Sequence, residues 1–466
     1  MSKFFEAVSN IFRIPDLRTR ILFTLAMLAV YRFGQHVPTP GVDALRFEEF
    51  VRQNAGSFLG FIDLFSGGAF RRLSIFALGI MPYITASIIL QLLTVVVPTL
   101  EKLQKEGELG RRKITQWTRY LTVGLALIQS FGIATMLQAS EGNFVLSPGF
   151  GFIALTMLSL TTGTAFIMWL GEQITERGIG NGMSLIIFAG IVVGLPGAIQ
   201  EIWTNVFVTR QWNPLQLTII IAIMIAVVAF IVLVERGERR IPVQYAKRVV
   251  GRRMMGGQST HLPLKVNAGG VIPVIFASSL LAFPQTLNNV EFVRNSPYLR
   301  GLLSAIDGTS PLYFVLFTAL IIFFCFFYVS IIFNPNEAAD NMRKYGGFIP
   351  GIRPGKNTAE YMNKILTKIT VVGGLYLALL SLIPQVMISG IRLQRIPGIG
   401  GWIDEHFPRW LLDGLGVSFF FGGTSLLIVV GVAMDTVNQV EAQLIMRHYE
   451  GFTPRSGRIR GRRSSV

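Results

Sequence analysis

The sequence predicts an all-α polytopic membrane protein that crosses the bilayer ten times. Hydrophobic residues make up 51% of the 466 residues, charged residues make up only 15%, and the mean hydropathy is +0.53. The chain contains ten apolar stretches near the length of about 20 residues that a helix needs to cross the hydrocarbon core. This composition is typical of a polytopic membrane protein and not of a soluble domain with a large core.

The expected spans follow from the positions of the apolar stretches. In chain order they are 17–34, 75–97, 119–137, 151–171, 183–200, 215–234, 268–287, 312–333, 368–389 and 415–435. The fifth span is interrupted by helix-weakening residues at Gly190, Gly194, Pro196 and Gly197. An even number of spans places both termini on the same side of the membrane.

The distribution of basic residues indicates which side that is. About three quarters of the 42 Lys and Arg fall in the two termini and the even-numbered connections. Because cytoplasmic segments carry an excess of Lys and Arg, we expect both termini in the cytoplasm. The net charge of +16 is then concentrated on one face, where it can meet anionic lipid, acidic proteins or RNA.

One stretch between the first two spans is too short and too charged to be a span of its own. It comprises Phe61, Ile62, Asp63, Leu64, Phe65, Ser66, Gly67, Gly68, Ala69, Phe70, Arg71 and Arg72, followed by Leu73 and Ser74. Non-helical backbone at membrane depth survives only inside protein or in a water-filled cavity. We therefore expect residues 61–74 to fold back as a re-entrant half-helix, either as a removable stopper in a cavity or as an interfacial turn that anchors the next helix.

The segments outside the spans are basic and carry their own structural signals. Residues 1–16 form a weakly amphipathic surface segment, and residues 437–466 form a basic tail. The 235–267 loop has the alternation of a β-hairpin with a glycine turn. The 334–368 loop is rich in Gly and Pro, and a helix begins within Thr358–Lys364 with Thr358 as its N-cap. Such loops are either solvent-exposed connections without a further role or a docking surface. Their length and their predicted hairpin and helix favour a docking surface.

The spans lack the groups that intramembrane chemistry needs. The middle of nearly every span contains no Asp, Glu, Lys or Arg, whereas ion-coupled transporters usually need ionisable groups at depth. The chain has a single cysteine, Cys325, and its four His show no ligand spacing, so neither a metal site nor a redox cofactor is expected. The motifs HExxH and GxSxG are absent. A secondary transporter of small solutes remains the alternative to a passive channel, and an intramembrane enzyme is the weaker rival.

Branched aliphatic and small polar residues recur within the spans. Ile80 and Ile84 lie four apart on one helical face, and Met183 and Ile187 repeat that spacing. Such pairs are ordinary packing unless several helices direct them at one point, where a narrow aliphatic constriction would block ions by dewetting. Five polar residues mark a helix–helix seam that is either permanent or able to open sideways: Thr85, Ser87, Gln91, Ser278 and Ser279.

Five long segments resemble one known family. They read SIFALGIMPYITASIILQLL, ERGIGNGMSLIIFAGIV, NAGGVIPVIFASS, GFIPGIRPGK and FGGTSLLIVVGVAMD, and they occur in the family's order. The chain resembles bacterial SecY, the central subunit of the Sec protein-conducting channel, over essentially its whole length apart from the tail. The resemblance implies two inverted-repeat halves of five helices each, residues 17–200 and 201–436, in a multi-pass protein of the bacterial inner membrane.

The resemblance also implies a role for each group of residues. The plug corresponds to 61–74, and the pore ring to Ile80, Ile84, Met183, Ile187, Ile275 and Ile428, with Met183 in place of the usual isoleucine. The lateral gate lies between the second and third spans and the seventh and eighth. The cytoplasmic loops, with Arg239, Arg240, Lys247, Arg248 and Arg353, dock the SecA ATPase or the ribosome. SecE and SecG are the implied partner subunits, and the substrate is an unfolded polypeptide with a signal sequence, whose apolar segments leave into the membrane lipids.

Overall fold

The computed structural model describes residues 14–53, 63, 66–139, 144–209, 214–245, 248–250, 253–255, 259–287, 310–389 and 423–450. The first half contains the helices α2 (Pro15–Gly34), α3 (Ala44–Gln53), α5 (Met81–Val96), α6 (Pro98–Lys105), α7 (Glu108–Ala139), α8 (Phe150–Arg177), α9 (Gly182–Val193), α10 (Leu195–Trp203) and the π-helix η1 (Thr204–Val208). The second half contains α11 (Pro214–Glu235), α12 (Ile272–Leu287), α15 (Pro311–Ile332), α16 (Pro335–Lys344), α17 (Lys356–Ser389) and α20 (Gly423–Glu450).

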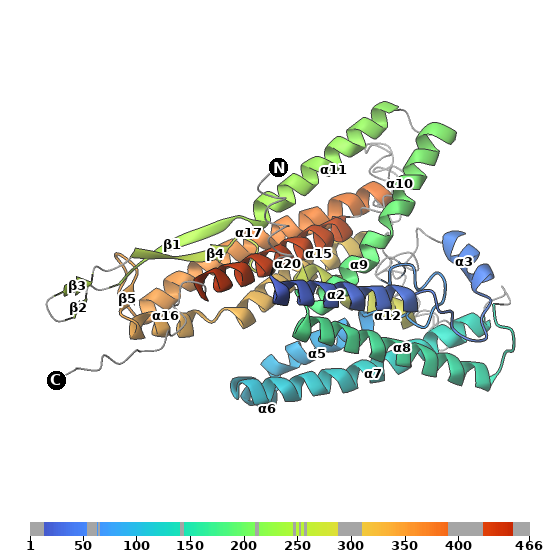
Figure 1. The fold of residues 1–466 in the computed structure, drawn as a ribbon, viewed down its shortest axis with the longest axis horizontal. Coiled ribbons are helices and arrows are strands. Elements are labelled where there is room, and N and C mark those ends of the chain that lie inside the picture. The colour runs from blue at the N-terminus through green and yellow to red at the C-terminus, as the bar shows by residue number, and fades with distance from the viewer. Residues whose placement is uncertain are drawn as a thin grey trace, which may run out of the picture.

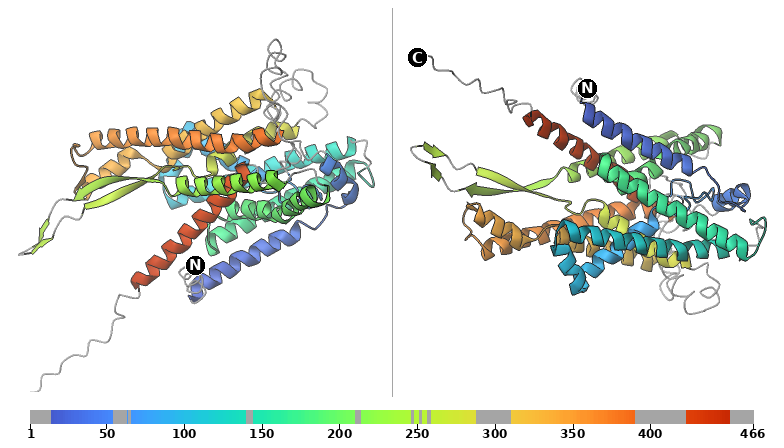
Figure 2. Two further views of the ribbon diagram at one scale, coloured as in Figure 1. Left: turned by 90° about the horizontal axis from the view of Figure 1, so that it is seen from above. Right: turned by 60° about the horizontal axis from the view of Figure 1, so that its bottom comes forward.

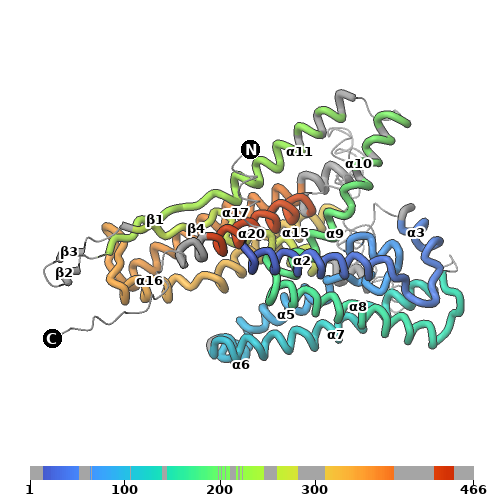
Figure 3. Tube along the Cα trace, viewed as in Figure 1, coloured from blue at the N-terminus to red at the C-terminus, as the bar shows by residue number. Residues whose placement is uncertain are grey.

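The long helices form an elongated bundle (Figure 1). A β-ribbon extends from one end of this bundle, and Figure 2 shows that it reaches beyond the ends of the helices. The amphipathic helix α3 lies at the opposite end (Figure 3). The two ends of the molecule therefore differ in kind, since one carries the strands and the other carries α3.

Helices lie at all the predicted spans, with some different boundaries. Residues 75–80 are turns, and α5 begins only at Met81, with Pro82 in its first turn. Pro fits there because the first helical N–H groups have no intrahelical partner. The helices α7 and α17 begin well before the predicted spans, and the fifth span breaks at Gly194 into α9 and α10. Residues 415–422 of the tenth predicted span lie outside the described residues.

Length and composition independently identify membrane-spanning helices. Within the described residues, five helices are long and apolar enough to cross a bilayer, and a bent pair counts as a sixth: Met81–Val96 and Pro98–Gln104, which meet at 103°. The segments Gly182–Gly197, Met224–Glu235 and Ile272–Leu281 are apolar but shorter. Together with the family fold described below, these helices confirm the predicted polytopic all-α class.

The ribbon contains strands from both predicted loops. β1 (Glu238–Tyr245) pairs antiparallel with β4 (Ser259–Lys265), and the short strands β2 (Arg248–Val250) and β3 (Arg253–Met255) form its tip. This confirms the predicted hairpin. β5 (Gly347–Phe348) pairs with the other edge of β1, opposite Tyr245 and Gln244. The 235–267 and 334–368 loops, which the sequence treats separately, therefore form one sheet.

The predicted N-cap in the second loop was wrong. α17 begins at Lys356, so Thr358 lies inside its first turn, and the Thr358 hydroxyl donates a hydrogen bond to the carbonyl oxygen of Arg353 at 3.0 Å. The hydroxyl thus fixes the preceding turn instead of accepting from the helix. In the tail predicted at 437–466, α20 continues as helix to Glu450.

Candidate functional site

One cavity of about 440 Å³ lies among the helices of both halves. It is lined by side chains of α5, α7, α8, α9, α12 and α15 and of the turn before α9: Tyr83, Ile84, Ser87, Gln91, Thr115, Arg119, Glu172, Thr175, Glu176, Asn181, Met183, Ser184, Ile187, Ile272, Ile275, Phe276 and Tyr328. Four of the six predicted ring residues, Ile84, Met183, Ile187 and Ile275, are among them. The two remaining predicted ring residues, Ile80 and Ile428, are buried in the hydrophobic core that also contains Ile84, Ile187 and Ile275.

The ring residues share one hydrophobic core although they come from four parts of the chain. Ile80 and Ile187 are each 2% exposed, and Ile428 is fully buried. Aliphatic side chains offer no hydrogen bonds to water or ions, so a constriction built from them excludes both by dewetting. The structure thus brings together the residues that the resemblance assigned to the ring, and their role as a ring stays a prediction.

Local structure fixes Met183, the predicted ring position for which the resemblance implies an isoleucine in most of the family. The Asn181 side chain caps α9 by accepting hydrogen bonds from the backbone N–H groups of Met183 and Ser184, at 3.1 and 3.5 Å. Across the helix interface stands Gly171 of α8, where an added Cβ would collide with the Met183 sulfur. The glycine therefore makes room for the flexible methionine side chain.

Charged groups lie around the same cavity. Arg119 of α7 donates to the Glu172 carboxylate of α8 at 2.8 Å, and both residues line the cavity. Glu176 lies one helical turn further along α8 and also lines it. The wall of the cavity is thus part charged and part aliphatic.

The described part of the plug segment, Asp63 and 66–74, is anchored at the α3 end. The rings of Phe70 and Phe47 meet edge to face at 5.7 Å between centroids, and Arg71 pairs with Glu48 at 3.3 Å. The Asp63 carboxylate accepts from the backbone N–H of Arg71 at 2.8 Å. Ala69 belongs to the same core as the ring isoleucines, whereas Phe70 belongs to a second core with Phe47. Phe61, Ile62, Leu64 and Phe65 lie outside the described residues.

The polar residues predicted at the seam hydrogen-bond mostly within their own helices. Thr85 donates to the Met81 carbonyl at 3.0 Å, Gln91 donates to the Ser87 hydroxyl at 3.3 Å, and Ser278 donates to the Ile275 carbonyl at 2.9 Å. Helical Ser and Thr reach the carbonyl one turn back more easily than a partner on another helix. Among side chains that the structure describes, one hydrogen bond joins α12 to α5, from the Ser279 hydroxyl to the Met81 sulfur at 3.9 Å.

The structure describes four of the five predicted docking residues, three on strands of the ribbon and one in the turn before α17. Arg239 and Arg240 are on β1, and Arg240 pairs with Glu238 at 2.6 Å. Arg353 is exposed in the turn before α17. Arg248 is on β2 at the tip, and Lys247 lies outside the described residues.

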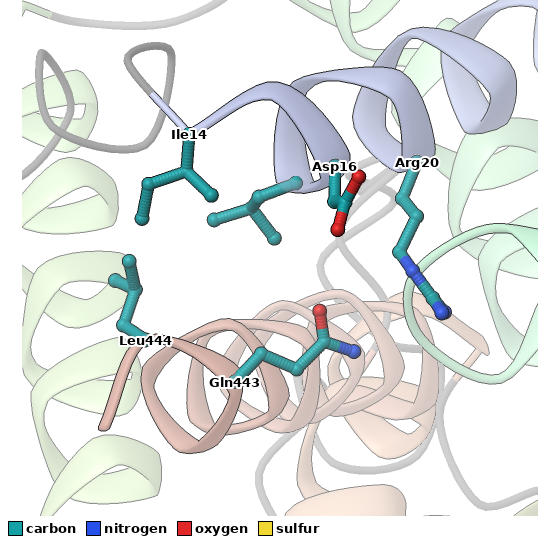
Figure 4. A pocket seen from close by; sticks show the side chains of 6 residues that line it. Ile14, Asp16, Arg20, Gln443 and Leu444 are labelled. Carbon is teal, nitrogen blue, oxygen red and sulfur yellow. The ribbon is translucent and has the colours of Figure 1, made fainter. Parts of the chain in front are cut away.

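Two further features were not predicted from the sequence. A small hollow between the start of α2 and the end of α20 is lined by Ile14, Asp16, Leu17, Arg20, Gln443 and Leu444 (Figure 4), and it shares no residue with the large cavity. The second feature is a set of polar side chains at the C-terminal end of α2, Tyr31, Arg32 and the C-cap residue Gln35, that contact the predicted plug segment. The spacing of Tyr31 and Gln35, four residues apart in the last turn of a span, was the available signal.

Solved structures share the fold of this chain. One is described as "The plug domain of the SecY protein stablizes the closed state of the translocation channel and maintains a membrane seal", with a TM-score of 0.63, 19% identity, and coverage of 94% of this chain and 95% of that one. Another is Sec61 in the canine ribosome–channel complex from the endoplasmic reticulum, with a TM-score of 0.59, 18% identity, and coverage of 94% and 95%. The fold is that of a protein-conducting membrane channel.

Sequence comparison identifies the family. The SecY family model matches residues 74–437, and the protein translocase subunit SecY of Escherichia coli (strain K12) is 49% identical over 442 residues, which cover 94% of each chain. The chain belongs to the SecY family. It is a channel-forming subunit for protein translocation, and the family is not a family of enzymes.

Proposed function

We propose that the aliphatic ring seals the channel at rest and that residues 61–74 are its plug. The carrying observation is that Ile84, Met183, Ile187 and Ile275, from both halves of the chain, line one cavity and share a core with Ile80 and Ile428. The plug residue Ala69 packs into that same core. Displacing the segment would open a path past the ring, and the flexible aliphatic side chains would deform around a passing chain.

The halves 17–200 and 201–436 face each other, and the seam between α5 and α12 is the lateral gate. Among the described side chains the one hydrogen bond across this seam is the long hydroxyl–sulfur contact, so the seam costs little to part. An apolar segment of the translocating chain then leaves for lipid, because burial there gains about 25 cal/mol per Å² of apolar surface. The polypeptide itself enters unfolded, led by its signal sequence.

The joined sheet of β1, β4 and β5 is the docking surface for the partner that supplies the driving energy. Arg239 and Arg240 on β1, with Lys247, Arg248 and Arg353 from the same two loops, supply positive charge, which suits an acidic protein partner, for which we expect the SecA ATPase, or the RNA of a ribosome. The ribosome is the partner named for the similar canine channel complex. SecE and SecG complete the complex, and the channel itself carries no catalytic site.

The protein lies in the bacterial inner membrane with the sheet and both termini in the cytoplasm. The excess of basic residues in the termini and in the even-numbered connections supports this orientation. The plug, at the α3 end, is then on the outer side of the ring.

A stalled translocating chain tests the path. Cysteines are introduced singly at Ile84 and Ile275 in a Cys325→Ser background, and a half-exported chain carrying one cysteine is oxidised in place. We expect disulfides from both positions to the chain, and no disulfide from a cysteine at the exposed residue Leu379. Crosslinking at Leu379 but at neither ring position would contradict the proposed pore.

A further inference from the structure

Three side chains near the end of α2 converge on the backbone of the plug segment. Nε2 of Gln35 donates to the Ser66 carbonyl oxygen at 2.8 Å, and the Tyr31 hydroxyl donates to the same oxygen at 3.4 Å. Nη1 of Arg32 donates to the Gly67 carbonyl oxygen at 3.4 Å and to Oε1 of Gln35 at 2.6 Å. Tyr31, Arg32 and Gln35 are called the α2 latch below.

The latch holds Gln35 in one orientation. Arginine can only donate hydrogen bonds, so the Gln35 oxygen must face Arg32, and its amide N–H groups are directed at the plug backbone. Gln35 is 1% exposed and Tyr31 is 2% exposed. If the plug segment leaves, these buried donors lose their acceptor, and leaving a buried donor without a partner is costly.

The plug backbone fits between the latch and α9. Gly67 has a φ of +67°, and an added Cβ would lie 2.7 Å from Nε2 of Gln35 and 2.7 Å from Cα of Gly190. The segment is thus enclosed by α2 on one side and on the other by α9, the helix that carries Ile187. Only glycine combines this backbone conformation with so close an approach on both sides.

We propose that the α2 latch sets the free energy needed to displace the plug, and so how firmly the channel stays shut without a translocating chain. This inference rests on the proposed function of residues 61–74 as the plug. Gln35 is a positioning residue, because it holds the Ser66 carbonyl and does not line the cavity. When the plug is displaced, the Ser66 carbonyl can bind water, but the buried donors of Gln35 and Tyr31 lose their acceptor. The displacement is therefore unfavourable.

Two substitutions of Gln35 separate the hydrogen bond from side-chain size. Gln35→Glu keeps the size and the Arg32 contact but places an acceptor against the Ser66 carbonyl, and Gln35→Met keeps the size without either hydrogen bond. The readout is the ion conductance of the reconstituted complex in planar bilayers without substrate. We expect roughly a threefold to tenfold rise in open probability for Gln35→Met and a larger rise for Gln35→Glu, from the loss of about one buried hydrogen bond.

A neighbouring residue provides the matched control. His36 follows Gln35 and is exposed, and its Nδ1 makes a hydrogen bond with the Arg32 carbonyl oxygen at 3.0 Å, within the same turn of chain. His36→Gln should conduct like the original chain. Thermal unfolding of each purified complex checks that the variants are folded, and open probabilities of both Gln35 variants equal to that of His36→Gln would overturn the latch.

A plug deletion separates the failure of the latch from the failure of the plug. Deleting 61–69 should itself raise the conductance, and Gln35→Glu should then add nothing further. An added leak in the deleted channel would show that Gln35 acts elsewhere, which overturns the latch and leaves the plug standing. If the deletion alone produced no leak, the proposed plug function would fail, and the latch with it.

Discussion

The ring of Phe70 in the plug segment meets the ring of Phe47 on α3 edge to face, with 5.7 Å between the centroids. Phe47 is fully buried and also contacts Phe144, at 5.6 Å. The Arg71–Glu48 ion pair lies beside this aromatic cluster. Residues 69–74 of the predicted plug segment are therefore fastened to α3, and the two glycines before them, Gly67 and Gly68, have left-handed backbone conformations.

Phe47→Ala should loosen this anchor. Removing a buried phenylalanine costs about 3–5 kcal/mol, so we expect a lower melting temperature of the purified complex. A cysteine at Ala69, in a Cys325→Ser background, should also react faster with a membrane-impermeant maleimide added from outside. The control is Phe150→Ala, because Phe150 is 85% exposed. An unchanged labelling rate in a destabilised Phe47→Ala complex would mean that α3 stabilises the fold without holding the plug.

Glycine at the ring should open an ion leak. Ile187→Gly and Ile275→Gly each remove a buried aliphatic side chain from the cavity wall, and we expect conductance without substrate to rise on the order of tenfold. Glycine also weakens a helix by about 1 kcal/mol wherever it is placed. Ile221→Gly on α11, where the side chain is 46% exposed, controls for that effect. Its conductance without substrate should not rise. Equal conductance of all three variants would contradict the proposal that the aliphatic ring seals the channel.

The spans could be predicted from the sequence because an apolar stretch of about 20 residues is typical of a helix that crosses a membrane. The sequence also predicted the hairpin from the alternation around Val243 and Tyr245, both of which lie on β1. The start of α5 was misplaced, since residues 75–80 are as apolar as the helix that follows, and composition does not distinguish apolar turns from helix. Pro82, which favours a first helical turn, was the overlooked signal.

The site was only partly predictable, because its members come from distant parts of the chain. Ile84 and Ile275 are ordinary apolar residues on their own helices, and only the resemblance to a family related them to one another. The α2 latch was missed because hydrogen bonds to backbone carbonyls leave no pattern at the accepting residues. The pairing of β5 with β1 was missed for a similar reason, since a strand of two residues carries no periodicity.

Linking α5 to α12 should close the lateral gate. The Ser279 hydroxyl and the Met81 sulfur are 3.9 Å apart, so cysteines at these positions, with Cys325→Ser, can be joined by a short bis-methanethiosulfonate reagent. We expect the joined channel to stop inserting an apolar membrane protein, and reductant to restore insertion. The two single-cysteine variants, treated identically, should insert normally. Full insertion through the crosslinked channel would place the exit to lipid elsewhere.

Reversing the charge at Arg353 should weaken docking without disturbing the fold. Arg353 is exposed, and the hydrogen bond that ties it to α17 uses its carbonyl oxygen, which accepts from Thr358 whatever the side chain is. We therefore expect Arg353→Glu to keep its melting temperature while the Kd for SecA or for ribosomes rises about tenfold to a hundredfold, as the loss of a charged contact implies. Lys356→Glu makes the same charge change at an exposed residue of the first turn of α17. If both variants weakened binding equally, docking would depend on net charge, whereas a selective loss with Arg353→Glu would assign it to the side chain at position 353.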